Sequence, residues 1–372
     1  MKTTNTMKAR WLLALPCLGF GAGACAQGSV SLFGMLDAGV TYVSNQSGNR
    51  GVLLDTGVYV PSIFGMRGNE DIGGGSKVFF ELASQFSNDN GATIPSNGAL
   101  FARQALVGLG NASWGKISLG NQYDFMTESL LFAGLDGGLL YGGFYNFRNG
   151  PFTGLGIPNN PTGATDFDRV GASTRVANSV KYVTPSIGGF TLGALYGFGE
   201  VAGSITSGRT ASAGVNYERG PLALGAAVTD ARYSAINNGR DGIRNIGVGV
   251  HYGFPSVLAH ILYTNTRNTL SGAMVNVVQA GANWTLSGAL TLGANYQWMK
   301  GNAQLSHNKA QQITSTLMYA LSKRTSVYLE GVYQHAAGDH GAQAWINGLF
   351  GPDAASSGSS QAIGRIGMAT RF

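Results

Sequence analysis

Apolar side chains fall on every second position over most of this 372-residue chain. In residues 289–299 they occupy alternate positions: Leu290, Leu292, Ala294, Tyr296 and Trp298. Residues 190–198 and 313–321 follow the same two-residue period. Successive side chains of a β-strand point to opposite faces, so this period predicts strands with one apolar face and one small or polar face. The spacing of an amphipathic helix does not fit these stretches.

The chain carries little charge for its size. Asp, Glu, Lys and Arg make up 11% of its residues, whereas soluble domains average about 25%. Beyond residue 26, no uninterrupted apolar run approaches the roughly 20 residues of a membrane-spanning helix. A soluble β-sandwich would also alternate, but here the second face is poor in Lys and Glu and rich in Gly, Ser, Thr and Asn. The composition favours strands with lipid on one side and a crowded lumen on the other.

Aromatic residues and connection lengths support a membrane barrel over a sandwich. Aromatic side chains stand near the ends of the expected strands, as in the girdles at the two membrane interfaces. They are Tyr42, Tyr182, Tyr196, Tyr217, Tyr252, Tyr263, Trp284, Trp298 and Tyr333. Short turns, such as residues 111–113 and 218–221, alternate with longer polar segments. Outer-membrane barrels alternate short periplasmic turns with long external loops in this way.

Sixteen segments share the strand pattern, centred near residues 36, 63, 80, 105, 118, 178, 194, 213, 226, 248, 261, 278, 294, 315, 329 and 367. An even number of strands brings both chain ends to the periplasmic side, and sixteen strands enclose an aqueous lumen. The predicted fold class is all-β, a 16-stranded antiparallel transmembrane β-barrel. The last segment is apolar on one face and ends at Phe372, which we expect to be the signal read by the barrel-assembly machinery during biogenesis.

Residues 1–26 have the three parts of a cleavable signal peptide. Basic residues precede a short apolar run, and small residues follow before a predicted cleavage at Gln27. The run is too short for a spanning helix and contains Pro16. A lipoprotein anchor at Cys25 is the alternative, disfavoured because no Leu stands three residues before it. We therefore expect residues 27–372 to form one exported barrel domain in the outer membrane.

The exported part has its own charge balance. Both cysteines lie within residues 1–26, so no disulfide is expected. Three of the 24 basic residues lie there too, which leaves 21 basic against 18 acidic residues, a net charge of +3. These charges are scattered rather than clustered, which argues against nucleic acid as a partner. No cofactor is expected.

At the start of the exported part, residues 30–39 (VSLFGMLDAG) resemble the opening strand of Gram-negative trimeric general porins, especially the neisserial and Burkholderia-type outer-membrane porins. Residues 65–75 look like that family's second strand and glycine turn, and residues 101–109 with 115–124 are similar to the hairpin before its constriction loop. Residues 175–182 match the next strand. The resemblance implies a water-filled channel for passive diffusion of ions and small hydrophilic solutes. It also implies a homotrimer embedded in outer-membrane lipid and lipopolysaccharide.

The family further implies a third external loop folded into the lumen, and the unpatterned residues 124–172 stand where that loop belongs. Family constrictions set acidic residues against basic residues of the wall, which would bias ion passage. The expected acidic residues are Asp124, Glu128, Asp136 and Glu81. Strand parity selects the expected basic wall: Arg103, Lys116, Arg175, Lys181 and Lys77. The same parity places Leu106 toward lipid.

Two positions depart from the family pattern. Ile63 and Asn121 stand where relatives commonly carry basic residues. With two wall charges fewer, we expect a weaker anion preference than in strongly anion-selective relatives. The preferred solute is left open, since it depends on how residues 124–172 fold.

A membrane-embedded hydrolase is the second function class. It would need a nucleophile beside a general base. The five histidines show no such motif: His251, His260, His307, His335 and His340. A channel without enzyme activity is therefore predicted. His335, Asp339 and His340 could bind a divalent ion, but a Gly-rich external loop gives them no fixed scaffold, so no metal site is expected.

Overall fold

The computed structural model describes residues 28–95, 98–339, 341–348 and 354–372. The predicted signal peptide, residues 1–26, lies outside the described residues. The described part is dominated by one antiparallel sheet. Its strands are β1 (Ser29–Gln46), β2 (Asn49–Thr56), β3 (Ile63–Gly73), β4 (Ser76–Gln85), β5 (Gln104–Asn111), β6 (Gly115–Gln122), β7 (Val176–Val183), β8 (Phe190–Gly197), β9 (Thr210–Arg219), β10 (Leu222–Arg232), β11 (Gly242–Gly253), β12 (Val257–Asn268), β13 (Met274–Thr285), β14 (Leu290–Gly301), β15 (Lys309–Ala320), β16 (Thr325–Ala337) and β17 (Ser360–Arg371).

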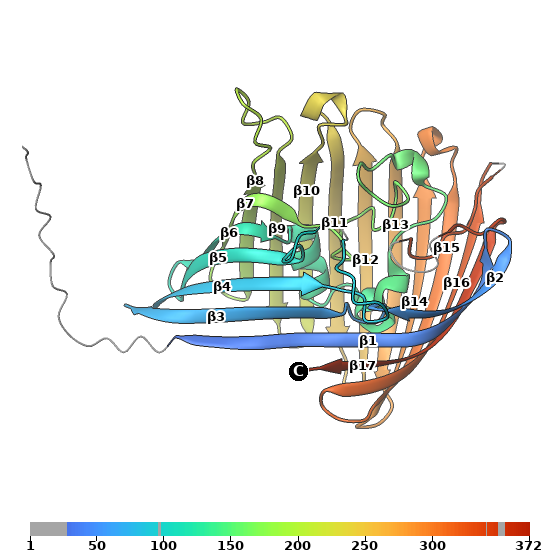
Figure 1. Cartoon of the computed structure of the whole chain (residues 1–372), viewed down its shortest axis with the longest axis horizontal. Helices are drawn as coiled ribbons and strands as arrows, with labels where there is room; N and C mark the ends of the chain where they lie inside the picture. Colours follow the sequence, from blue (N-terminus) through green and yellow to red (C-terminus); the bar gives the residue numbers. More distant parts are fainter. Residues whose placement is uncertain (1–27, 96–97, 340, 349–353) are drawn as a thin grey trace, which may run out of the picture.

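The sheet closes on itself because β1 pairs with β17 along one edge. Along its other edge, β1 pairs with β2 through its second half and with β3 through its first half. Strands β2 and β3 therefore act as one wall element, interrupted at residues 57–62, and the barrel has sixteen such elements. This confirms the predicted 16-stranded barrel, and each predicted centre falls within a strand. Figure 1 shows β1 and β3 to β6 running across the steeper strands β10 to β16.

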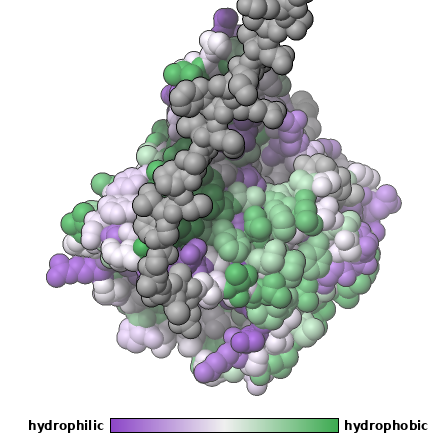
Figure 2. Space-filling view, turned by 60° about the vertical axis from the view of Figure 1, so that its left-hand side comes forward, coloured by the Kyte–Doolittle hydropathy of each residue, from purple (hydrophilic) through white to green (hydrophobic). Residues whose placement is uncertain are grey.

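The two faces of the wall differ as the alternation predicts. On β14, Tyr296 is 44% exposed, whereas the next residue, Gln297, is fully buried. Exposed large apolar side chains occur on many strands of the wall, among them Leu119, Val248 and Ile366. Figure 2 shows apolar residues gathered over a broad area of one face, with polar residues around it. Apolar side chains therefore form the outer surface of the barrel, where lipid contacts it.

Connections of two lengths lie at opposite ends of the barrel. One end carries the short turns: residues 74–75, 112–114, 184–189, 220–221, 254–256, 286–289 and 321–324. The other end carries the longer segments, including residues 86–103, 123–175, 198–209 and 233–241. Among the described residues, no helix is long and apolar enough to cross a membrane. The predicted alternation of short and long connections is therefore present.

The barrel is filled by residues 123–175, between β6 and β7. This segment, called the inner loop below, contains four short helical elements: η1 (Thr127–Phe132), α1 (Gly137–Gly142), η2 (Gly143–Asn146) and η3 (Thr153–Leu155). Two further turns, η4 (Asn237–Gly239) and η5 (Ala303–Leu305), lie in other connections. Gln297 on β14 donates to the Asn146 carbonyl (3.1 Å), and Gln312 on β15 donates to that of Tyr145 (2.7 Å). These bonds confirm the inward-folded third loop.

The apolar core lies inside the barrel, between the inner loop and the wall. Phe147, Phe152 and Phe167 of the loop are fully buried. Phe152 and Phe167 meet edge to face, with ring centroids 5.7 Å apart. They join wall residues such as Val275 and Met299 in one apolar cluster. The inner loop therefore gains apolar burial, which stabilises a segment too long to hold its shape by itself.

Parity at the start of β5 differs from the prediction. Leu106 pairs with Glu81 of β4, so it points into the lumen, whereas Val107 pairs with Leu119 and is 49% exposed on the outer face. The prediction that Leu106 faces lipid was wrong. The error arose because the prediction extended one alternation from Arg103 through the strand. In the structure β5 begins at Gln104, so Arg103 belongs to the preceding connection and does not share the alternation of the strand.

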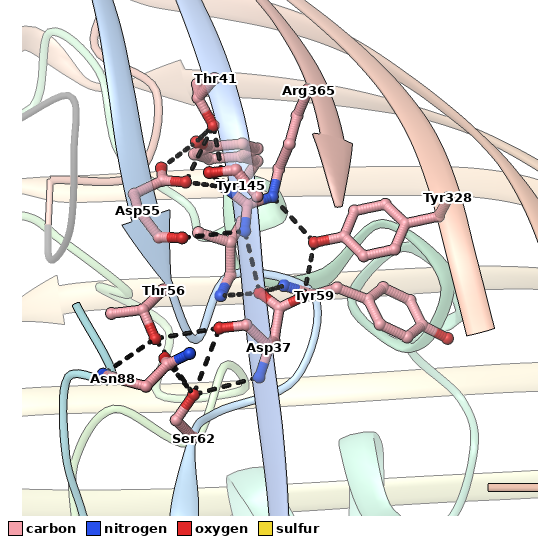
Figure 3. Close-up of polar contacts among 12 residues, drawn as sticks. Asp37, Thr41, Asp55, Thr56, Tyr59, Ser62, Asn88, Tyr145, Tyr328 and Arg365 are labelled. Carbon is pink, nitrogen blue, oxygen red and sulfur yellow. Dashed lines mark hydrogen bonds and ion pairs between the residues drawn. The ribbon is translucent and has the colours of Figure 1, made fainter. Parts of the chain in front are cut away.

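A buried polar network holds the closure between β1 and β17 (Figure 3). The guanidinium group of Arg365 on β17 forms ion pairs with Asp37 on β1 (3.0 Å) and with Asp55 on β2. Tyr328 on β16 donates to Asp37 (2.6 Å) and accepts from Arg365 (2.8 Å). Tyr145 of the inner loop donates to Asp55 (2.6 Å). One arginine therefore connects the closing strands and, through Asp55, the inner loop.

Candidate pore constriction

Two cavities lie against the wall formed by β3 to β7. The first, of about 460 Å³, is lined by four basic and two acidic side chains: Arg67, Lys77, Lys116, Lys181, Glu81 and Glu128. The second, of about 480 Å³, is lined by Arg103 and Arg175, together with residues 85–102 and 144–177 in part. Lys77 and Lys116 also line a third cavity, near the short turns. The sequence-predicted basic residues therefore gather on one side of the lumen.

Tyr123 contacts three of these basic residues. The guanidinium carbons of Arg103 and Arg175 lie 5.8 and 5.7 Å from the centroid of its ring. The Lys181 ammonium donates to the Tyr123 carbonyl (3.2 Å). Guanidinium groups stack favourably on aromatic rings, so the ring fixes both arginines in place. Gln85 accepts from Arg103 at 2.5 Å and supports the same arrangement.

Arg175 is buried but keeps its positive charge. Its side chain is enclosed by the backbone carbonyls of Ala102, Ala172 and Ser173, to which it donates. Burial lowers the pKa of Arg175 to about 10. An arginine with that pKa remains protonated at neutral pH, so Arg175 keeps its positive charge beside Arg103.

Two of the predicted acids face the same cavity as the basic residues. Glu128 of η1 accepts from Lys181 at 2.6 Å, and about a third of its side chain is exposed. Glu81 pairs across the sheet with Arg67 of β3. Each acid therefore lies next to a basic residue.

The other two predicted acids are buried within the inner loop. Asp124 forms an ion pair with Arg169, and Asp136 forms one with Arg148 at 2.5 Å. Both carboxyl groups are fully buried. Carboxylates are buried only with such partners, because the loss of hydration must be offset. Asp124 and Asp136 therefore hold the shape of the loop, and their side chains do not face the open lumen.

Arg148 is the centre of this buried cluster. It also contacts Asp168 (3.2 Å) and donates to Gln279 on β13 (2.8 Å). Asp166 lies nearby and accepts from the backbone of Gly171 (2.7 Å). Burial, together with the neighbouring Asp168 carboxylate, raises the pKa of Asp166. The inner loop is thus fastened to the far wall by one arginine with two carboxylate partners.

Several important residues were missed by sequence reasoning. Arg67 lines the first cavity. Strand parity could have found it, because the neighbouring apolar Met66 lies on the opposite face of the same strand. Arg148 and Arg169 lie in an unpatterned segment, so no periodic signal pointed to them. Of the departures from the family pattern, Ile63 is buried opposite Gln85, and Asn121 donates to the Ala102 carbonyl (2.9 Å).

Two remaining predictions concern the chain end and a metal. Phe372 follows β17, and its backbone exchanges hydrogen bonds with Gly34 of β1 (3.0 and 3.2 Å). His335 lies 3.0 Å from the hydroxyl of Ser360, Asp339 is exposed, and His340 is outside the described residues. Within the described part, no group of three His, Cys, Asp or Glu side chains is placed to hold a metal ion.

Comparisons with known proteins agree with this geometry. A family model described as Gram-negative porin matches residues 13–339. Outer membrane porin protein 32 of Delftia acidovorans is 30% identical over 324 residues, which cover 85% of this chain and 87% of that protein. An outer membrane porin of Bordetella pertussis is 28% identical, covering 88% of this chain and 94% of that protein.

A solved anion-selective porin from Comamonas acidovorans has the same fold, with a TM-score of 0.73, 24% identity, and coverage of 93% of this chain and 100% of that one. The barrel, the inner loop and these relatives lead to one assignment. The chain belongs to the Gram-negative porin family and forms a water-filled outer-membrane channel for passive diffusion of ions and small hydrophilic solutes.

Proposed function

We propose that this porin passes small anions in preference to cations through a constriction beside β4 to β7. The observation that carries the proposal is the charge of the two cavities. Their linings contain six basic side chains and two acidic ones. Fixed charges of one sign raise the local concentration of ions of the other sign. Since Ile63 and Asn121 replace basic residues of the family pattern, the preference is weaker than in strongly anion-selective relatives.

Glu81 and Glu128 set the limit of this preference. Each lies beside a basic residue, so the constriction carries local acid–base pairs together with basic residues that form no ion pair among the described residues. Asp124 and Asp136 contribute nothing to the open path, because Arg169 and Arg148 neutralise them inside the inner loop. Arg103, Arg175 and Lys181 around Tyr123 are the basic residues at the narrow point, and Lys77 and Lys116 extend the positive wall toward the short turns.

Removing two wall charges is expected to lower the anion preference. In a Lys77→Gln, Lys116→Gln double variant, the anion-to-cation permeability ratio should fall roughly fivefold. Two charges about 8 Å from a hydrated ion at moderate ionic strength stabilise an anion, and destabilise a cation, by about 0.5 kcal/mol together. The measurement is the reversal potential of single channels in a KCl gradient.

The matched control is Lys323→Gln with Arg324→Gln, which makes the same charge change in the turn at residues 321–324. Its reversal potential should equal that of the parent. A parent channel that prefers cations, or a Lys77, Lys116 variant with an unchanged reversal potential, would contradict the proposal.

We also propose that the channel has no catalytic activity. Its family is one of channels. His335 and Ser360 are within hydrogen-bonding distance, but among the described residues no Asp or Glu bonds to His335 to complete a nucleophile–base–acid set. Bilayer conductance without hydrolysis of ester or peptide substrates is the expected result.

Assembly and export complete the proposal. Residues 1–26 act as the cleaved signal peptide, Phe372 serves the barrel-assembly machinery, and the mature chain forms a homotrimer in lipid and lipopolysaccharide. In support of the trimer, a structurally similar outer membrane protein of Vibrio cholerae was solved in a trimer form, with a TM-score of 0.65. Light scattering of the detergent-solubilised protein measures the number of chains.

A further inference from the structure

Four arginines lie on neighbouring strands of the outer wall, at the end of the barrel that carries the long connections. They are Arg209, Arg232, Arg244 and Arg267, here called the arginine row. Arg209 immediately precedes β9, Arg232 ends β10, Arg244 lies near the start of β11, and Arg267 near the end of β12. The Arg232 amide donates to the Arg209 carbonyl (2.9 Å), and Arg244 pairs directly with Arg267. The four residues are therefore contiguous across the sheet.

Strand parity places the arginine row on the lipid-facing side. Arg244 shares its face of β11 with Ile246 and Val248, which are 46% and 52% exposed. Arg267 shares its face of β12 with Ile261 and Tyr263, which are also exposed. None of the four residues lines the two cavities of the constriction. The row therefore belongs to the outer surface and plays no part in the ion path.

The height of the row coincides with a membrane interface. From Arg244 to the aromatic residue Tyr252 at the other end of β11, eight residues span roughly 26 Å along a tilted strand, or about 20 Å along the membrane normal. The apolar outer residues lie between these two positions. An arginine on the lipid face is strongly unfavourable at mid-membrane and nearly neutral at the interface. The row thus marks the level of the external headgroups.

The charges of the row are only partly compensated. One carboxylate, that of Asp230, serves three arginines: Arg244 at 2.9 Å, and Arg209 and Arg232 at 3.6 Å. Among the described residues, no acidic side chain forms an ion pair with Arg267. Asp241 lies beyond the row and bonds to Asn237 (2.7 Å) and Thr269 (2.9 Å).

Even with Asp241 counted, four arginines and two acids leave a charge of +2. Arg244 donates to Asp230 through Nε (3.0 Å) and Nη2 (2.9 Å), and its side chain is 53% exposed, so its Nη1 group remains accessible to a further anion. Asp230 holds the guanidinium groups of its three arginine partners together and orients them. It does not occupy all of their N–H donors. Such an array can bind an anion with several oxygen atoms.

We infer that the arginine row binds the phosphate groups of lipopolysaccharide in the outer leaflet. Guanidinium groups form paired, charge-assisted hydrogen bonds with phosphate oxygens, and clustered basic residues at a membrane surface bind anionic headgroups. The acyl chains of the same lipid would lie on Ile246, Val248 and Ile261, directly below the row. The inference rests on the proposed outer-membrane orientation, with the long connections external, and is independent of the proposed ion selectivity.

The test measures lipid binding to the detergent-solubilised full-length porin by native mass spectrometry. Three probes are compared: lipid A with both phosphates, lipid A with its phosphates removed, and inorganic phosphate. The parent should bind the phosphorylated lipid at least about tenfold more tightly than the dephosphorylated one. In the Arg244→Gln, Arg267→Gln variant, affinity for phosphorylated lipid A should fall by roughly 25-fold, since each basic residue at such a surface contributes about fivefold.

Asp230 keeps Arg209 and Arg232 as partners in this variant, so the barrel should remain folded. The matched control is again Lys323→Gln with Arg324→Gln, which removes two charges from the opposite end and should bind like the parent. The Arg244, Arg267 variant should keep the parent's conductance and reversal potential. A failure of the ion-selectivity proposal is therefore distinguishable from a failure here.

Three results would overturn the inference. The first is equal binding of phosphorylated and dephosphorylated lipid A by the parent. The second is binding of inorganic phosphate as tight as that of phosphorylated lipid A, which would make the row a site for free anions. The third is a change in oligomer size in the variant, which would assign the row to a contact between copies. If the double variant fails to fold, Arg267→Gln alone tests the same contact.

Discussion

Replacing Arg365 by methionine is expected to lower the free energy of unfolding of the barrel by about 3–5 kcal/mol. The change leaves Asp37 and Asp55 buried without their cation, at the place where β1 meets β17. Methionine fills similar space, so the loss comes from two uncompensated carboxylates and not from a cavity. Urea unfolding of the protein in detergent, followed by tryptophan fluorescence, measures the change.

Two companion variants separate this cause from a general effect of mutation. Arg50→Met removes an exposed arginine of β2 and should leave the unfolding midpoint unchanged. Adding Asp37→Asn and Asp55→Asn to Arg365→Met removes the unpaired charges and should recover part of the stability. An Arg365→Met protein as stable as the parent would show that the closure does not depend on this network.

Replacing Arg148 by methionine is expected to release the inner loop from the far wall. Asp136 and Asp168 would lose their shared partner, and Gln279 would lose its donor. Removing one partner of a buried ion pair costs about 3–5 kcal/mol, which raises the population of a displaced loop by roughly 200- to 5,000-fold. Because the loop occupies the lumen, single-channel conductance should increase and fluctuate between levels.

The design of this experiment again depends on matched variants. Arg240→Met makes the same chemical change in the exposed connection at residues 233–241 and should leave the traces unchanged. Adding Asp136→Asn and Asp168→Asn to Arg148→Met should restore a steadier channel. A single Arg148→Met channel with the parent's conductance and noise would refute the anchoring role.

The strands could be predicted from the sequence because each one carries its own signal. A wall with lipid on one side and a polar lumen on the other repeats every two residues, so local sequence is sufficient. The Gly-rich turns between strands reinforce the pattern. All sixteen wall elements were located in this way, although the break at residues 57–62 was not seen.

The inner loop could not be predicted in the same way. Its shape depends on ion pairs between distant residues, such as Asp124 with Arg169 and Asp136 with Arg148. Such pairs have no period and no fixed spacing, so nothing local distinguishes a buried acid from one that faces the lumen. Parity also fails where a strand begins or bulges. Asn178, for example, has a positive φ of 51°, and the register of β6 against β7 shifts nearby.

The fastening of the inner loop to one side makes the channel eccentric. Gln279, Gln297 and Gln312 belong to the inner surface of the barrel, yet all three are buried beneath the loop. The two cavities lie on the opposite side, beside β3 to β7 and the near side of the loop. The proposed ion path runs through these cavities and avoids the covered half of the barrel. Charge introduced on the covered half would therefore affect folding more than permeation. Permeation can instead evolve through a small number of positions on the side that faces the cavities.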